Sequence, residues 1–211
     1  TNVTINGIPI NDSESHGMYW VNMTDISSSV NNIQVQRGVG PSSNGASAFG
    51  ASINVETNTL NKEAYATLDN SFGSFNTLRN TVKAGTGLLN DKFIIDTRLS
   101  SIQSDGYVDR SAAELKSFML SGTWLGENST LRATMFSGKE RTEQAWYGTP
   151  ESVINGSIED ITAYADRNYI FGSDRDNLLT AGRKYNYYTY DNEVDNYQQD
   201  HYQLHLIIFL K

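Results

Sequence analysis

Histidine, cysteine and serine are the residue types from which a search for chemistry starts, and here they offer little. The three histidines are His16, His201 and His205. His201 and His205 share one face of an alternating segment, where the strand rise separates them by about 13 Å, too far to ligate one metal ion. The absence of cysteine excludes disulfides and thiolate metal sites, and no serine lies in the context of a nucleophile elbow. We therefore predict no catalytic residue, no metal site and no cofactor, and a protein that is not an enzyme.

Tyrosines and carboxylates gather near the C-terminal end, between residues 185 and 197, and predict binding rather than catalysis. We expect Tyr187, Tyr188 and Tyr190 to contact a ligand, because tyrosine offers amphipathic contact area at a low entropic cost. The alternative is an extended strand pair whose tyrosines form an aromatic belt near a membrane surface. The three carboxylates at positions 191, 193 and 195 can bind a cation weakly, although such clusters more often form a solvated face.

A second candidate ligand surface lies near the N-terminal end, where residues 11–22 are polar and then aromatic. One interpretation is a packed loop between strands. The other is a loop that touches ligand, in which case the contacts are those of His16, Tyr19 and Trp20.

The glycine-rich stretch from residue 32 to residue 57 is the element around which the rest of the chain is organised. Ile33, Val35 and Arg37 alternate with glutamines in the period of two expected of a strand. Glycines at 38, 40, 45 and 50 break the pattern, and Ile53 and Val55 resume it. Glycine permits positive φ and the close approach of another backbone. The stretch therefore predicts a hairpin that is squeezed against another surface.

This stretch resembles the plug signature of TonB-dependent outer-membrane receptors. The matching residues are Arg37-Gly38, Gly45, Ala48-Phe49-Gly50-Ala51, Ile53-Asn54 and Thr57. Two positions depart from the family pattern: Asn44 stands where tyrosine is usual, and Ala51 where a second glycine is usual. Both leave the spacing intact. The alternative is a glycine-rich hairpin unrelated to this family.

The resemblance implies a barrel of about 22 strands that holds a plug in its lumen. It further implies active import of a scarce nutrient across the outer membrane, for which an iron chelate is our preferred ligand. The partners would be a TonB-type energy-coupling protein, whose contact segment we expect outside this chain, and outer-membrane lipid. Residues 190–206 are similar to ferric-siderophore members of the family. The residues expected to pack the plug against the barrel are Arg37, Gly38, Gly45, Gly50 and Asn54, with Arg37 paired to a carboxylate of the barrel wall.

Six long alternating segments follow, at about 64–72, 78–88, 93–100, 117–124, 131–138 and 202–211. Tight turns are predicted at Asn90-Asp91 and Glu127-Asn128, whereas the links at about 103–114 and 139–199 are long. This alternation of short turns and long loops is typical of outer-membrane barrels.

Three local motifs predict smaller elements. Asn6-Gly7 between apolar alternating residues predicts a hairpin over residues 1–11. Asp25 is expected to cap a short helical turn at 26–30. Within the longest loop, Thr149 as cap and Pro150 at the first position predict a helix whose apolar spacing extends to Ala165, weakened at Asn155-Gly156.

Composition narrows the possible classes of protein. A net charge of −8 argues against a nucleic-acid surface, and no run of roughly 18 apolar residues predicts a transmembrane helix. We predict an all-β fold, a fragment of a plugged outer-membrane β-barrel in which plug hairpins precede about six long antiparallel strands. The predicted domains are residues 1–58, the C-terminal half of the plug, and residues 59–211, the first strands and extracellular loops of the barrel.

The rival prediction is a soluble or cell-surface β-rich binding module or adhesin. The two differ in whether the apolar face of the six strands is covered by other parts of the chain. For the isolated chain we expect oligomerisation or a need for detergent, because six barrel strands leave two edges and an apolar face open.

Overall fold

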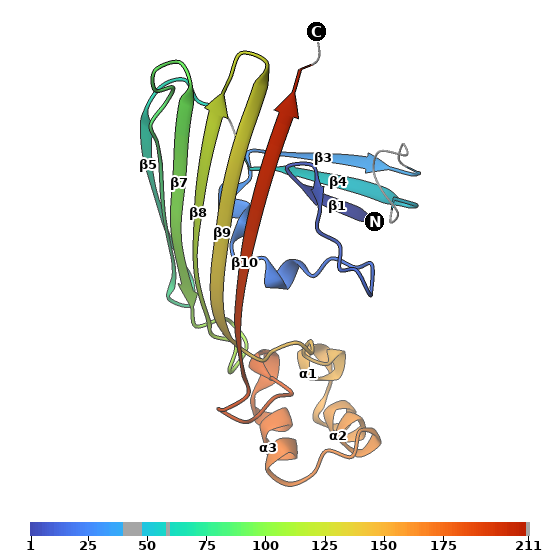
Figure 1. The fold of residues 1–211 in the computed structure, drawn as a ribbon. Coiled ribbons are helices and arrows are strands. Elements are labelled where there is room, and N and C mark those ends of the chain that lie inside the picture. The colour runs from blue at the N-terminus through green and yellow to red at the C-terminus, as the bar shows by residue number, and fades with distance from the viewer. Residues whose placement is uncertain (40–47, 58–59, 210–211) are drawn as a thin grey trace.

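The computed structural model describes residues 1–39, 48–57 and 60–209, and shows two β-sheets and a group of short helices (Figure 1). The large sheet has the strand order β10-β9-β8-β7-β6-β5, so each strand pairs with its neighbours in sequence, and all pairs are antiparallel. Its strands are β5 Tyr65–Gly73, β6 Thr77–Gly85, β7 Phe93–Ser104, β8 Ala113–Leu125, β9 Ser129–Glu143 and β10 Val194–Ile208. In the described residues β5 and β10 are the two edges, and the sheet is not closed into a barrel.

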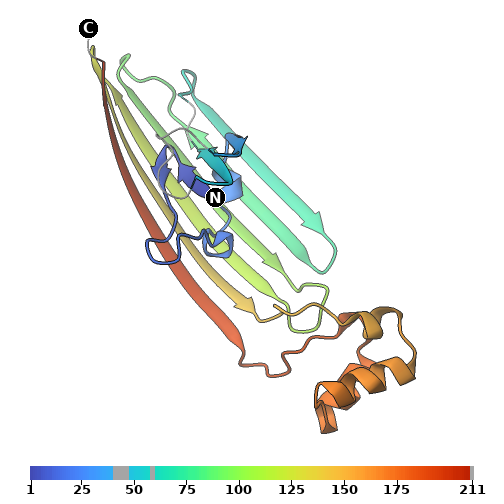
Figure 2. The same ribbon diagram turned by 90° about the vertical axis from the view of Figure 1, so that its right-hand side faces the viewer.

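The large sheet has an outward face with apolar side chains and an opposite, inward face with polar side chains. Its outward side chains stay exposed, as shown by Phe72 at 80% and Leu204 at 70%. On the opposite face Arg98, Ser121 and Thr123 are buried. The small sheet lies against this polar face (Figure 2). The alternation predicted from the sequence is therefore confirmed, and the apolar residues form the uncovered face.

Four strands are longer than predicted: β7 continues to Ser104 and β8 begins at Ala113, beyond the predicted 93–100 and 117–124, and the last two differ most. The fifth was expected to end at Gly138 and the sixth to begin at Tyr202, but β9 continues to Glu143 and β10 begins at Val194. The ladder between them runs unbroken from Ser129 opposite Ile208 to Glu143 opposite Val194. Polar residues carry the added pairs on both faces, so no apolar alternation marks them in the sequence.

The small sheet has the order β2-β1-β4-β3 and contains β1 Asn2–Ile5, β2 Ile8–Pro9, β3 Asn32–Arg37 and β4 Ala51–Glu56. The predicted hairpin is present: β1 and β2 are antiparallel around Asn6 and Gly7, both of which have positive φ. The predicted pairing of the two arms of the glycine-rich stretch is also confirmed, because β3 and β4 are antiparallel. The predicted squeezing against another surface is not seen in the described residues: β3 is exposed throughout, and a Cβ at Gly38 or Gly50 would meet nothing within 4 Å. β1 joins β4 in parallel.

An apolar cluster connects the two sheets. Ile5, Met23 and Val55 from the N-terminal part pack with Met119 of β8 and Phe136 of β9. Met119 interrupts the alternation of the fourth strand in the sequence. Its contact with this cluster explains why an apolar side chain occupies the polar face.

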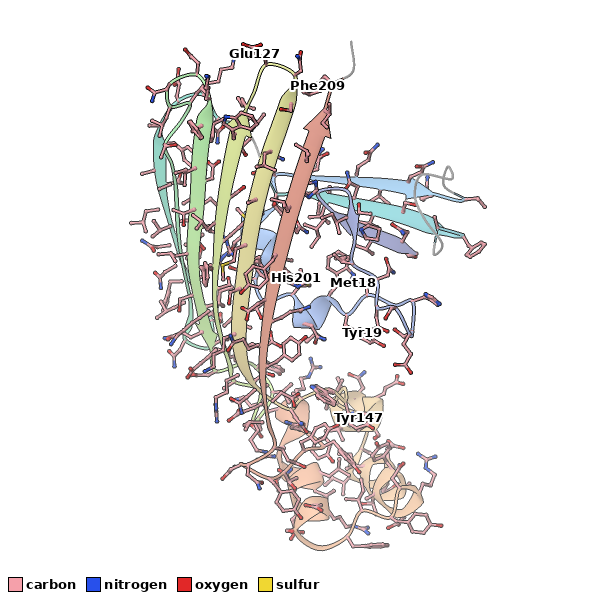
Figure 3. The ribbon with its side chains drawn as sticks, in the orientation of Figure 1. Met18, Tyr19, Glu127, Tyr147, His201 and Phe209 are labelled. Atoms are coloured by element: carbon pink, nitrogen blue, oxygen red, sulfur yellow. The ribbon has the colours of Figure 1, made fainter. Side chains whose placement is uncertain are left out.

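The connections follow the predicted alternation of short and long loops only in part, because the link at 74–76 is short although it lies at the end of the long links, and the link at 86–92 is almost as long as that at 105–112. The turns at 86–92 and 126–128 share one end of the large sheet with the end of β10, as Glu127 and Phe209 show (Figure 3). The long links at 105–112 and 144–193 lie at the opposite end, where Tyr147 is found (Figure 3).

The longest loop contains three α-helices, α1 Glu151–Asn155, α2 Ile158–Arg167 and α3 Gly172–Thr180. The single helix predicted from Thr149 is divided at Gly156, and Thr149 donates to the carbonyl of Tyr185 at 3.2 Å instead of capping. Among the described residues no helix is both long and apolar enough to span a membrane. The described part of the chain also contains the 3₁₀ turns η1 Trp20–Asn22, η2 Ile26–Ser29 and η4 Gly182–Lys184.

Candidate functional site

Asp25 forms the centre of an ion cluster between the large sheet and the N-terminal part of the chain that carries the small sheet, residues 1–39 and 48–57, here called the small-sheet segment. Its side chain is 3% exposed. Arg98 of β7 donates from Nη1 to the carboxylate and to the backbone carbonyl of Asp25, at 3.2 Å each. Ser28 donates to the same carboxylate at 2.6 Å, Ser100 donates to it as well, and Arg79 Nη2 lies 3.9 Å away. This carboxylate therefore binds groups from two strands of the large sheet.

The cap predicted for Asp25 is wrong. The residue does occupy the cap position of η2, but it has a φ of 48° and its side chain makes no cap hydrogen bond. The carboxylate faces the large sheet instead. A buried arginine needs a counter-charge with hydrogen bonds, and this requirement outweighs the capping of one short turn.

Three further contacts join the same surfaces. Thr24 donates to Glu140 of β9 at 3.1 Å, and Asn6 donates from Nδ2 to Gln203 of β10 at 3.1 Å. Gly138 of β9 permits the close approach of Thr24, because a Cβ at this glycine would lie 2.6 Å from the Thr24 Cβ. The small-sheet segment is thus fixed to β7, β9 and β10 by polar groups.

The residues predicted for plug–barrel packing occupy a different part of the small sheet. Arg37 is exposed at the end of β3, and among the described residues no salt bridge includes it. Gly38 has a φ of 91°, which explains the need for glycine, and a Cβ at Gly38 or Gly50 would meet nothing within 4 Å. Asn54 accepts a hydrogen bond from Thr4 at 2.7 Å within the sheet. Gly45 lies outside the described residues. A role of these residues in barrel packing stays a prediction.

The predicted tyrosines gather at the long-loop end of the molecule. Tyr147 stacks on Tyr188 with ring centroids 5.7 Å apart, and packs edge-on against Tyr187 at 5.2 Å. Trp146 makes an edge contact with Tyr188 at 6.1 Å. Tyr187, Tyr188 and Tyr190 also line one cleft of about 470 Å³, together with residues that follow α2. The structure therefore places all three in one region, as aromatic loop residues rather than as part of a strand pair.

A buried amide holds this region in place. Asn186 is 0% exposed. Its Nδ2 donates to the carbonyls of Asp109 at 2.8 Å and Gln144 at 2.9 Å, and its Oδ1 accepts from the backbone N–H of Tyr188 at 3.0 Å. One side chain thus ties three loop segments together. The sequence does not single out Asn186, because asparagine is abundant in this chain and nothing in its neighbourhood marks it as buried.

Two tyrosines of this region, Tyr185 and Tyr188, have hydroxyls with a raised pKa. Desolvation by burial raises the pKa of Tyr185, and the nearby Tyr164 and Asp174 raise it further. The pKa of Tyr188 is also raised, first by desolvation and then by Tyr147 and Glu193. These hydroxyls can therefore donate hydrogen bonds to a ligand.

The N-terminal candidates lie apart from the tyrosine cleft. Tyr19 and Trp20 are 55% and 46% exposed, and His16 is exposed with a φ of 54°. Figure 3 shows Tyr19 on the side of the small-sheet segment nearer the long-loop end, where Tyr147 lies. None of the three lines the cleft. Their contact with ligand stays a prediction.

The acidic residues at 191–195 serve local hydrogen bonds. Glu193 accepts from the backbone N–H of Tyr190 at 3.1 Å, and Asp195 accepts from Gln144 at 3.4 Å. Within the described ranges no group of three or more histidine, aspartate or glutamate side chains is arranged to hold a metal ion.

Comparison with known proteins identifies the fold. No protein-family model and no curated protein matches the chain. The ferric-catecholate import receptor Fiu of E. coli K12 matches at a TM-score of 0.65 and 18% identity, over 96% of this chain and 28% of that one. The chain has the fold of part of a barrel-type receptor.

Two other receptor structures give the same result. The ferripyoverdine receptor of the outer membrane of Pseudomonas aeruginosa matches at a TM-score of 0.57 and 15% identity, covering 67% of this chain and 19% of its own. The ferric yersiniabactin uptake receptor FyuA of Yersinia pestis matches at 0.56 and 15%, covering 70% and 24%. The chain thus spans about a fifth to just over a quarter of the receptors that it matches.

Proposed function

We propose that this chain is part of a TonB-dependent receptor that imports an iron chelate across the outer membrane. On this proposal residues 1–58 are the C-terminal half of the plug, and residues 59–211 are the first strands and extracellular loops of the barrel. The outward apolar face contacts outer-membrane lipid, and a TonB-type protein supplies the energy by acting on the plug.

The observation that carries the proposal is the inverted polarity of the large sheet. A soluble β-sandwich buries its apolar face between sheets, whereas here large apolar side chains such as Phe72 and Leu204 are exposed. The polar face is covered, and the ion cluster of Asp25 and Arg98 joins it to the small-sheet segment. This is the arrangement that a plug inside a lipid-embedded wall requires.

Membrane contact can be measured with single-tryptophan variants of this chain. Trp124 lies on the outward face of β8, and Trp146 lies in the long loop. In vesicles that contain brominated lipid, we expect strong quenching of Trp124 in the Trp20→Phe/Trp146→Phe variant. The matched Trp20→Phe/Trp124→Phe variant should show weak quenching of Trp146.

Equal quenching of both tryptophans, or a chain that stays monomeric in water without detergent, would favour the soluble or cell-surface binding module instead. Import needs a separate assay with a complete receptor that carries these residues. In a receptor-deficient strain we expect growth on a ferric chelate, and no growth when the TonB-type protein is deleted. Restored uptake of cobalamin or a glycan, without any ferric chelate, would contradict the iron-chelate part.

A further inference from the structure

The cleft at the long-loop end has the size and lining of a small-molecule site. Its volume of about 470 Å³ lies in the range of ligand pockets. More than half of its lining residues are aromatic. Tyr169 and Phe171 come from the connection between α2 and α3, and Tyr187, Tyr188 and Tyr190 from the return towards β10. Two chain segments therefore present rings to one space.

These rings are available to a ligand. Tyr169, Phe171 and Tyr190 are all more than half exposed. Tyr187 and Tyr188 pack edge-on at 5.6 Å and 88°, so their ring planes are almost perpendicular. The face of an aromatic ring is negative and attracts a cation. A pocket walled by rings from different directions suits a group with positive charge spread over alkyl carbon.

The fixed charges of the cleft have the same sign as the ring faces. Among the described residues that line it, the charged side chains are those of Asp174 and Glu193. Their negative potential contributes to the raised pKa values of Tyr185 and Tyr188. Among the described residues that line the cleft there is no positively charged side chain: Arg110 donates from Nε to the carbonyl of Tyr188 at 2.8 Å, but it is not a lining residue.

We propose that this cleft binds an alkylammonium group, held by the ring faces of the tyrosines and by the carboxylates of Asp174 and Glu193. The group is carried by the imported chelate, and this part of the inference rests on the proposed function. A chelate that bears such a cation is attracted to the cleft. A chelate with several negative charges is repelled by it.

The charge dependence can be isolated with choline and 3,3-dimethylbutan-1-ol, its neutral carbon isostere. Binding is followed by the fluorescence of Trp146, which contacts Tyr188, in the Trp20→Phe/Trp124→Phe chain. We expect choline to bind about tenfold more tightly than the isostere. The Asp174→Asn/Glu193→Gln variant should lose most of this preference and keep its affinity for the isostere, which also reports that the cleft is folded.

The matched control is Asp69→Asn, which removes an exposed carboxylate on β5, distant in the chain from the cleft, and should change nothing. Equal affinities for choline and its isostere in the unmodified chain would overturn the inference. So would a choline preference that survives in the double variant.

A second pair of probes separates this inference from the proposed function. Gallium complexes of a linear trihydroxamate are compared with a free terminal ammonium group and with that group acetylated. We expect the ammonium form to bind about tenfold more tightly. Equal binding of the two forms overturns the cation site and leaves chelate import standing. If choline binds but neither gallium complex does, the cation site is supported, and recognition of a chelate in this cleft is contradicted.

Discussion

The ion cluster between the small-sheet segment and the large sheet consists of buried charged groups, whereas the tyrosine cleft at the long-loop end consists of exposed aromatic rings. In the first, Asp25 and Arg98 are almost completely buried; the Asp25 carboxylate binds several groups, and Arg98 donates from Nη1 to Asp25. In the second, Tyr187 and Tyr190 are more than half exposed, and Tyr187 packs edge-on against Tyr147. A buried charge permits one arrangement only, because any other leaves it without a partner. Exposed rings accept many arrangements at little cost.

This difference separates stability from binding. Substitutions in the ion cluster should change the free energy of unfolding and the docking of the two sheets. Substitutions of exposed tyrosines should change ligand affinity with little effect on stability, because their surface is already in water. The substitutions below test how far this separation holds.

The largest effect is expected from Asp25→Ala. It leaves Arg98, which is 1% exposed, without its counter-charge, and breaking a buried pair in this way costs about 3–5 kcal/mol. The free energy of unfolding is measured by urea titration in detergent, with Trp20 as the fluorescent reporter in η1.

The matched control is Arg175→Ala, which breaks the more exposed pair of Arg175 with Asp166 at 2.6 Å. It should cost less than about 1 kcal/mol. Similar losses of stability in the two variants would contradict the expectation that burial makes the Asp25–Arg98 pair more costly to break. The Asp25→Ala/Arg98→Met double variant should recover much of the loss, because it removes the orphaned charge.

Asn186→Ala is expected to have the next largest effect and to connect the two regions. It removes hydrogen bonds to the carbonyls of Asp109 and Gln144 and to the N–H of Tyr188. Leaving buried backbone groups unpaired costs about 2–3 kcal/mol. Near-ultraviolet circular dichroism should show loss of the ordered rings, and choline affinity should fall as well. An unchanged spectrum would show that the rings hold themselves in place.

Gly138→Ala tests the close approach between β9 and the small-sheet segment. The added Cβ would lie 2.6 Å from the Thr24 Cβ, and such overpacking costs about 1–2 kcal/mol. Hydrogen exchange of the backbone around Thr24 should become faster. Gly122→Ala on β8 is the control, since its Cβ meets nothing within 4 Å. Identical exchange in both variants would contradict a tight contact at Gly138.

The sequence predicts those parts of this molecule that repeat with a short period. Alternation in β7, for example, separates Leu99 from Arg98 and fixes which face each occupies. Continuous apolar alternation stops in β9 after Gly138, and the predicted strand stopped there too, although the backbone ladder continues to Glu143. Hydrogen bonds between strands do not depend on side-chain polarity, so polar ends of strands give no signal.

Contacts between distant residues could not be predicted in this way. Asp25 and Arg98 are 73 positions apart in the chain, and nothing local distinguishes Asp25 from a helix cap. Conversely, the tyrosines at 187–190 were recognisable as a binding region from their type alone, whereas Asn186, which positions them, resembles the many other asparagines. Residue types indicate what a site can bind, and only the fold shows what holds it.

The smallest effect is expected at the start of α2. Ser157 and Asp160 form a capping box, in which the Ser157 hydroxyl accepts from the N–H of Asp160 at 3.2 Å and the Asp160 carboxylate accepts from the N–H of Ser157 at 2.8 Å. Ser157→Ala should reduce the stability of the helical loop by about 1 kcal/mol. Far-ultraviolet circular dichroism of thermal unfolding measures this loss.

The same box should make the loop sensitive to acid. Hydrogen bonds from the backbone and side chain of Ser157 hold the pKa of Asp160 below its usual value of 3.8. A lowered pKa means that the folded state favours the charged form. Its stabilisation is therefore complete above about pH 5 and is lost as the pH falls below 3.8 and through the folded pKa. In Ser157→Ala the helical signal should depend less on pH in this range, and an unchanged acid transition would show that other carboxylates determine it.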